Sequence, residues 1–251
     1  MNEIFIPLLI STFAGLSTLI GAIFIFLKID DKSYNKFITL SLAFSASVMI
    51  GISIFDLIPE SFFLILNEYG MSKSIILLII AFIISYITIT ILNNLINKET
   101  NKNDLYRLGI LNMIVLILHN LPEGIATFLS SYQDIHLGIK LSIAIMLHNI
   151  PEGISIAVPI YYATGSLKKA FKATLLSGLA EPFGAIISFI FLKNYISELL
   201  ISIILIAVAG LMITLSIEEL IPKTLKYNEN KHLYLGLIIG FVLVIINVLF
   251  F

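Results

Sequence analysis

The segment LHNLPEGIA, residues 118–126, recurs in this chain as LHNIPEGIS, residues 147–155. Seven of the nine positions are identical, and the other two are conservative replacements. Each copy lies in the middle of a long apolar stretch, and about 20 apolar residues are enough for a helix to cross a bilayer. The repeat therefore places His, Asn and Glu side chains near the centre of two predicted membrane-spanning helices.

The composition extends this prediction to the whole chain. Of 251 residues, 59% are hydrophobic and only 12% are charged, and the mean hydropathy is +1.04, which is typical of membrane proteins rather than soluble domains. We expect an all-α, polytopic membrane protein with about eight transmembrane helices, residues 1–251 forming a single transmembrane domain. The apolar runs are residues 4–27, 37–58, 74–96, 108–131, 137–163, 170–192, 196–221 and 233–251.

The basic residues predict the orientation of these spans. The loops after spans one, three, five and seven hold twelve of the fifteen Lys and Arg residues. Because Lys and Arg favour the cytoplasmic side, both termini are expected on the outer side of the cytoplasmic (inner) membrane. Spans six and seven are the least separated, and we expect their turn at Lys193-Asn194-Tyr195.

The spacing within the motif predicts a shared carboxylate. Residues three and four apart lie on one face of a helix, so Glu123 neighbours both His119 and Asn120. The second copy repeats this arrangement in an antiparallel span, which resembles the inverted repeats of transporters. Its residues are His148, Asn149 and Glu152.

The residues beside these ligands also suit a membrane-embedded site. Pro122 and Pro151 each remove one helical hydrogen bond and leave a backbone carbonyl without its usual donor. Gly124 and Gly153 permit close helix approach. With no Lys or Arg expected at this depth, a divalent cation would compensate the buried carboxylates. A purely structural role, in which these polar groups tie two helices together, remains an alternative.

Other acidic residues lie within the predicted spans. Glu181 matches the depth of the two motifs and is the third candidate carboxylate, although a neutral, hydrogen-bonded Glu is an alternative. Asp56 to Glu60 (DLIPE) is echoed by residues 219–223 (ELIPK), near opposite faces of the membrane, as acids along an entrance and an exit would be. Interfacial roles are equally compatible with these positions and with Glu218. We expect His136 and His232 to be ordinary solvated loop residues.

Several classes of function are disfavoured. The net charge of −1 gives no reason to expect a nucleic-acid partner, and the absence of Cys rules out thiolate ligands. An intramembrane metalloenzyme is one alternative, but zinc proteases use H-E-x-x-H, whereas Asn follows each His here. A metal sensor without transport is another alternative. We therefore expect a protein that is not an enzyme.

The segments HNLPEGIATF (119–128), HNIPEGISIAVPIYYATGS (148–166) and SGLAEPFGA (177–185) resemble the ZIP family of metal-ion transporters, most closely its bacterial zinc-transporter branch. The resemblance covers the whole chain. It implies a binuclear site in spans four and five, bridged by Glu123 and Glu152. One ion would bind His119, Glu123, His148 and Glu152, and the other Asn120, Glu123, Asn149, Glu152 and Glu181.

The resemblance also implies transport of divalent ions into the cell. Imidazole with carboxylate suits zinc, iron, manganese and cobalt. The His-bearing site should favour zinc, and the Asn and carboxylate site should suit iron or manganese better. These ions are expected as substrates rather than resident cofactors, and the other partners are the lipid bilayer and a possible homodimer. Many relatives carry a long His-rich loop between spans three and four, whereas residues 98–107 are short and lack His, so metal capture by that loop is not expected.

Overall fold

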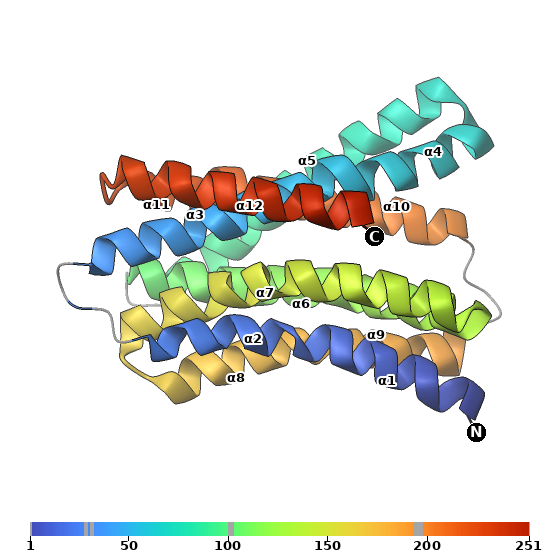
Figure 1. The fold of residues 1–251 in the computed structure, drawn as a ribbon. Helices are drawn as coiled ribbons and strands as arrows, with labels where there is room; N and C mark the ends of the chain where they lie inside the picture. Colours follow the sequence, from blue (N-terminus) through green and yellow to red (C-terminus); the bar gives the residue numbers. More distant parts are fainter. Residues whose placement is uncertain (1, 28–29, 31–32, 100–102, 193–197, 251) are drawn as a thin grey trace.

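The fold is known from a computed structural model, which describes every residue except 1, 28–29, 31–32, 100–102, 193–197 and 251 (Figure 1). The described residues form helices and the turns between them. Eight helical segments are long and apolar enough to cross a membrane, one for each predicted run. The predicted all-α fold with eight spans is therefore confirmed. The turn expected at Lys193-Asn194-Tyr195 lies outside the described residues.

Half of the spans are single helices, and the others are divided by a local change of helical geometry. The single helices are α5 (Met71–Glu99), α6 (Asp104–Gln133), α7 (Ile135–Thr164) and α12 (Asn230–Phe250). Span one comprises α1 (Asn2–Leu16), α2 (Thr18–Ala22) and η1 (Ile23–Phe26), and span two comprises α3 (Tyr34–Ile52), η2 (Ser53–Leu57) and α4 (Ile58–Tyr69). Span six comprises α8 (Leu167–Gly178), α9 (Ala180–Ile187) and η3 (Ser188–Leu192), and span seven comprises α10 (Glu198–Leu215), η4 (Ser216–Leu220) and α11 (Ile221–Leu225).

Span two continues beyond its predicted end at residue 58 and reaches Tyr69. A proline lacks an N–H and crowds the preceding turn, so Pro59 looks like a stop signal in the sequence. In the structure η2 is a wide, π-helical turn, closed by a bond from the Ile58 N–H to the Ser53 carbonyl. Pro59 then lies in the first turn of α4, where no N–H is required.

The spans pack as two groups, which appear as an upper and a lower layer in Figure 1. The first group consists of spans one, four, five and six, and the second consists of spans two, three, seven and eight. The groups meet where α3 packs against α7 and where α5 and α10 pack against α6. Both copies of the repeated motif lie in the first group, on α6 and α7.

Glycines allow the close helix contacts within this first group. A Cβ built at Gly124 would lie 1.9 Å from the Glu181 carbonyl oxygen on α9, and one at Gly153 would lie 1.9 Å from the Thr18 carbonyl oxygen on α2. The close approach predicted from these two glycines is confirmed. Gly15, Gly21 and Gly240 also face helices of the same chain, so they give no indication of a contact between chains.

Candidate metal site

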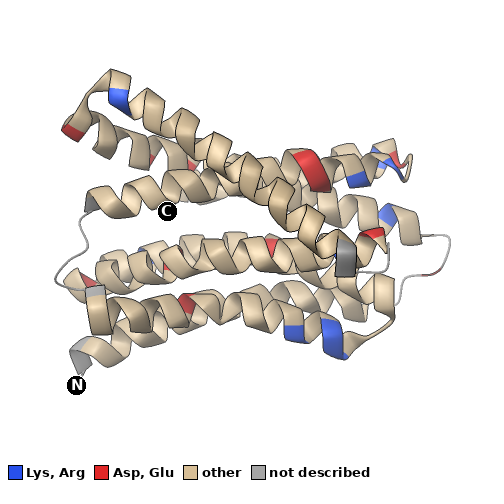
Figure 2. Ribbon diagram, turned by 180° about the vertical axis from the view of Figure 1, so that it is seen from behind, with Lys and Arg blue, Asp and Glu red and all other residues tan. Residues whose placement is uncertain are grey.

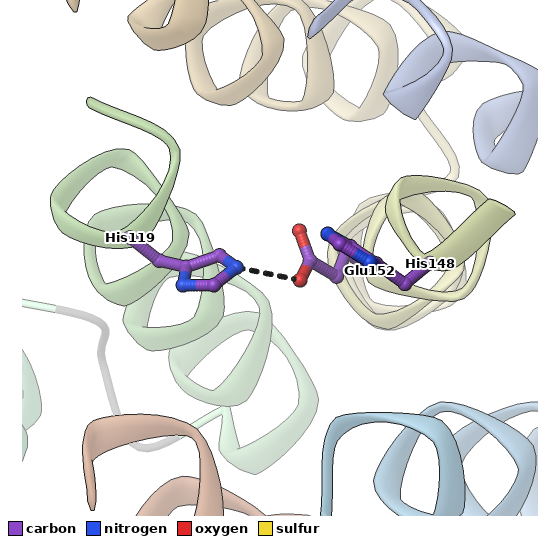
Figure 3. A group of neighbouring side chains, drawn as sticks. All are labelled: His119, His148 and Glu152. Carbon is purple, nitrogen blue, oxygen red and sulfur yellow. Dashed lines mark ion pairs between the residues drawn. The ribbon is translucent and has the colours of Figure 1, made fainter. Parts of the chain in front are cut away.

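Four side chains of the repeated motif converge between α6 and α7. The Nε2 atom of His119 lies 3.1 Å from Oε1 of Glu123 and 3.3 Å from Oε1 of Glu152, and Nε2 of His148 lies 3.0 Å from Oε1 of Glu123. Ligand atoms of His119, His148 and Glu152 all lie within 4.8 Å of one another. Figure 3 shows the Glu152 carboxylate between the two imidazole rings. The convergence follows from two helices that present the same residues to each other.

This cluster is buried and incompletely bonded. None of its four side chains is more than 4% exposed. Oε2 of Glu152 and Oε2 of Glu123 have no hydrogen-bond partner, and the polar contact of Glu152 Oε1 is the 3.3 Å approach of the His119 ring nitrogen. Among the described residues, no Lys or Arg pairs with either carboxylate. Because a buried, uncompensated carboxylate costs several kcal/mol, the arrangement suits a bound cation.

The other candidate residues lie beside this cluster. The Asn149 amide nitrogen donates to the Glu181 carboxylate at 2.5 Å and to the Ala14 carbonyl at 2.9 Å, and the Asn120 amide nitrogen donates to the Ser177 carbonyl at 3.1 Å. Since these partners are acceptors, both nitrogen positions are determined chemically. The Asn side-chain oxygens and Oε2 of Glu181 are left buried and without partners. The structure thus offers a second set of oxygen ligands.

A cavity of about 460 Å³ reaches the cluster from one end of the molecule. Glu123 and His148 lie at its base, and Gln133, at the end of α6, lies toward its mouth. The acids Asp56 and Glu60 of span two also line this cavity. The end of α6 lies at the end of the molecule where the N-terminus lies (Figure 1), so the residues that line the cavity extend from the cluster toward that end. An ion can therefore approach the cluster from this end, past the two acids of span two.

The echoed segment on span seven has different surroundings. Glu219 lies on η4, 8% exposed, and its carboxylate accepts a hydrogen bond from Arg107 at 2.7 Å. Glu218 is exposed on the outer surface of the same turn. Asn93, Arg107 and Ser177 were not singled out from the sequence. The sequence signal for Arg107 was its position as a basic residue close to the start of a span. Its partner, Glu219, lies 112 residues further along the chain.

His136 and His232 lie in the first turns of α7 and α12, not in loops as predicted. Asp134 caps α7 by accepting hydrogen bonds from the backbone N–H groups of His136 and Leu137. The helix therefore begins before His136 and includes it. The His232 ring bonds to Glu229 at 3.1 Å. His136 lies twelve residues before His148 on α7, and among the described residues neither His136 nor His232 belongs to the group that could hold an ion.

Eight apolar spans around a buried His and Glu cluster define a multi-pass membrane protein with a candidate metal site. The family profile described as ZIP Zinc transporter matches residues 96–247, which contain both copies of the motif and Glu181. Similar proteins include the zinc transporter ZupT of Oceanobacillus iheyensis, 39% identical with 99% of each chain covered. The zinc transporters ZupT of Streptococcus mutans and Clostridium perfringens are 38% and 35% identical over the whole of this chain and 99% and 98% of theirs.

The chain belongs to the ZIP zinc transporter family. The resemblance drawn from the paired motifs is therefore confirmed.

Proposed function

We propose that this protein transports divalent transition-metal ions, with zinc preferred, across the cytoplasmic membrane into the cell. The observation that carries the proposal is the buried convergence of His119, Glu123, His148 and Glu152 at the base of a cavity. Imidazole and carboxylate are ligands that suit zinc. The names of the relatives, which are zinc transporters, support the same function.

The proposed site holds two ions. The His119, Glu123, His148 and Glu152 side chains bind the first ion. The second ion takes the free oxygens of Asn120, Asn149 and Glu181 and shares the carboxylates of Glu123 and Glu152, which the inverted-repeat arrangement brings to both ions. The unpartnered oxygens of these Asn and Glu side chains support this assignment. Oxygen ligands suit manganese, and imidazole suits iron as well as zinc, so the same protein should carry iron, manganese and cobalt as well.

The proposed direction of transport is inward. Most described Lys and Arg residues lie at the end of the molecule away from the N-terminus (Figure 2). The positive-inside rule makes that end cytoplasmic, so both termini and the cavity mouth face outward. Asp56 and Glu60 then lie along the entrance, where their negative charge raises the local concentration of cations. The ion loses water in the cavity, binds the cluster and leaves inward when the helices rearrange.

The test is ⁶⁵Zn influx into proteoliposomes. Wild type is compared with the His148→Ala, Glu152→Ala double variant and with a matched control, the Glu229→Ala, His232→Ala variant. The control removes the same two residue types from a pair close to the start of α12. We expect saturable influx in wild type and control that is lost in the site variant. Equal influx in all three proteins would show that the cluster is structural.

The same experiment separates transport from metal sensing or metalloenzyme activity. If wild type binds zinc tightly, by calorimetry, but moves none into the vesicles, then the protein is a sensor or an enzyme. Competition of zinc influx by iron and manganese ranks the substrates. Each protein is checked by size-exclusion chromatography, so that loss of influx is not a loss of folding.

A further inference from the structure

Three polar side chains form a closed hydrogen-bonded ring at the end of the molecule opposite the cavity. Arg107 donates to the Glu219 carboxylate at 2.7 Å and to the side-chain oxygen of Asn93, and the Asn93 amide donates to the other carboxylate oxygen of Glu219. The Arg107 and Glu219 side chains are only 15% and 9% exposed. Charge-assisted hydrogen bonds of this kind, partly shielded from water, are stronger than surface ion pairs.

The ring joins the two groups of spans. Arg107 lies on α6, which belongs to the first group and carries the metal residues. Asn93 on α5 and Glu219 on η4 belong to the second group. A second ion pair follows the same division, since Asp104 of α6 lies 3.3 Å from the Nζ atom of Lys223 on α11. Separation of the two groups at this end therefore has to break both contacts.

The interior beside the ring is closed by apolar side chains. Leu108 and Leu111 of α6, Leu215 of α10 and Leu220 of η4 are fully buried in one apolar cluster. A hydrated divalent ion does not cross such a region without a large desolvation cost. An ion held by His119 and Glu152 can leave toward this end only if α6 moves away from the helices of the second group.

The two ends of the molecule carry equivalent acids that differ in whether a basic residue pairs with them. Segments 53–59 (SIFDLIP) and 216–222 (SIEELIP) share a sequence pattern, and each contains a π-helical turn directly before its proline. The turn η2 packs on α10, and η4 packs on α3. Asp56 lines the open cavity, and among the described residues no Lys or Arg pairs with it. Glu219, its counterpart, is neutralised by Arg107 at the closed end.

We propose that Arg107, Asn93 and Glu219 form the gate that holds the protein closed at the end opposite the cavity. The Arg107 guanidinium acts as a tethered cation on Glu219, and the ring must open before a metal ion leaves the His and Glu cluster toward that end. The inference rests on the proposed transport function, but opening of the gate can be measured without metal.

The first measurement is the labelling rate of a single thiol behind the gate. The chain has no Cys, so Leu111→Cys places one thiol on the face of α6 that carries Arg107, one turn further inside the membrane. Leu111 is fully buried, and its labelling by a small, charged methanethiosulfonate requires opening. The Glu219→Gln substitution is then introduced into the Leu111→Cys protein, and labelling is measured in detergent. It should raise the labelling rate about tenfold, because it removes the negative charge and one of the two acceptor oxygens that bond to Arg107 and Asn93.

Two further variants make the result specific. Glu229→Gln is the matched control, since it neutralises an acid near the same end whose partner, His232, lies in the same segment, and it should leave the rate unchanged. The charge-swapped variant Arg107→Glu, Glu219→Arg should restore slow labelling, because the Asn93 amide can reverse to serve both partners. Unchanged labelling in Glu219→Gln overturns the proposal, and so does fast labelling that the swap does not reverse.

A cross-link provides an independent test if Leu111→Cys does not fold. The Asp104→Cys, Lys223→Cys variant is bridged across the two groups with a short, reducible bis-methanethiosulfonate. We expect the bridge to abolish ⁶⁵Zn influx, and reduction to restore it, while the monofunctional reagent has no such effect. Normal influx through the bridged protein overturns the gate. Absence of influx before bridging counts against the transport function instead, and thiol labelling at a second buried position of α6, such as Leu108→Cys, then decides the gate.

Discussion

The contact between α6 and α9 offers a direct way to disturb one part of the proposed metal site. Gly124 follows the shared carboxylate Glu123, and a Cβ added at Gly124 would lie 1.9 Å from the carbonyl oxygen of Glu181. Ordinary Cβ contacts begin at 3.4 Å, so Gly124→Ala must displace α9 by about 1.5 Å. The substitution therefore moves Glu181 away from the motif residues without removing any ligand.

The magnitude of the effect follows from this displacement. Forcing one extra carbon into a tight contact costs about 1–3 kcal/mol of stability. The four His and Glu residues proposed as ligands on α6 and α7 keep their mutual positions, whereas Glu181 and its bond to Asn149 are disturbed. Because disturbed ligand support typically costs about 10–100-fold in metal affinity or activity, manganese influx should fall about tenfold or more, and zinc influx should fall less.

The assay compares zinc and manganese influx into proteoliposomes with thermal unfolding of the same proteins in detergent. Gly236→Ala is the matched control, because its added Cβ would lie 2.6 Å from the Leu40 carbonyl oxygen, at a contact between α12 and α3 in the second group. Both variants should unfold at a lower temperature, but only Gly124→Ala should change the ratio of manganese to zinc influx. A normal ratio in Gly124→Ala refutes the assignment of Glu181 to a second ion.

Three further predictions concern protons, the cavity acid and the Asn ligands. Zinc binding, measured by calorimetry, should weaken by about tenfold or more between pH 7 and pH 5, because a metal-binding imidazole must be neutral and protons compete with zinc for His119 and His148; stronger binding at pH 5 contradicts the site. Asp56→Asn should raise the zinc KM about threefold at low ionic strength with little change in maximal influx, since it weakens the field of the cavity; an unchanged KM shows that Asp56 has no part in capture. Asn149→Leu removes the donor to Glu181 and should reduce manganese influx more than zinc influx, whereas equal losses argue against separate ligand sets.

Local sequence patterns were sufficient to predict the spans and the approach of the motif residues to one another in the candidate site. The eight apolar runs are individually long enough to cross a bilayer, so each span could be recognised without its neighbours. The pairing of His119 with Glu123 depends only on the helical period. In the structure Nε2 of His119 lies 3.1 Å from Oε1 of Glu123. The short turn at Asp134 makes α6 and α7 antiparallel neighbours, which brings the second copy of the motif to the first.

The residues that pack beside Asp56 and Glu219 could not be predicted from local sequence patterns. The sequence placed Asp56 and Glu219 near opposite faces as equivalent acids, but their states depend on which helices pack beside them. The ring around Glu219 joins three spans, and Arg107 and Asn93 come from helices that precede η4 by many residues. No local period relates such residues, so only the tertiary structure identifies them.

An eight-span membrane protein with two facing copies of one His, Asn and Glu motif was predictable from the sequence alone, because hydrophobic length and helical period are local properties of a chain. The tertiary structure decided the rest. It divided the spans into two groups, oriented the Asn oxygens through the carbonyls of Ala14 and Ser177, left Asp56 in an open cavity and closed Glu219 against Arg107. These features depend on the packing of helices distant in sequence, whose apolar, lipid-facing surfaces carry little information about their neighbours.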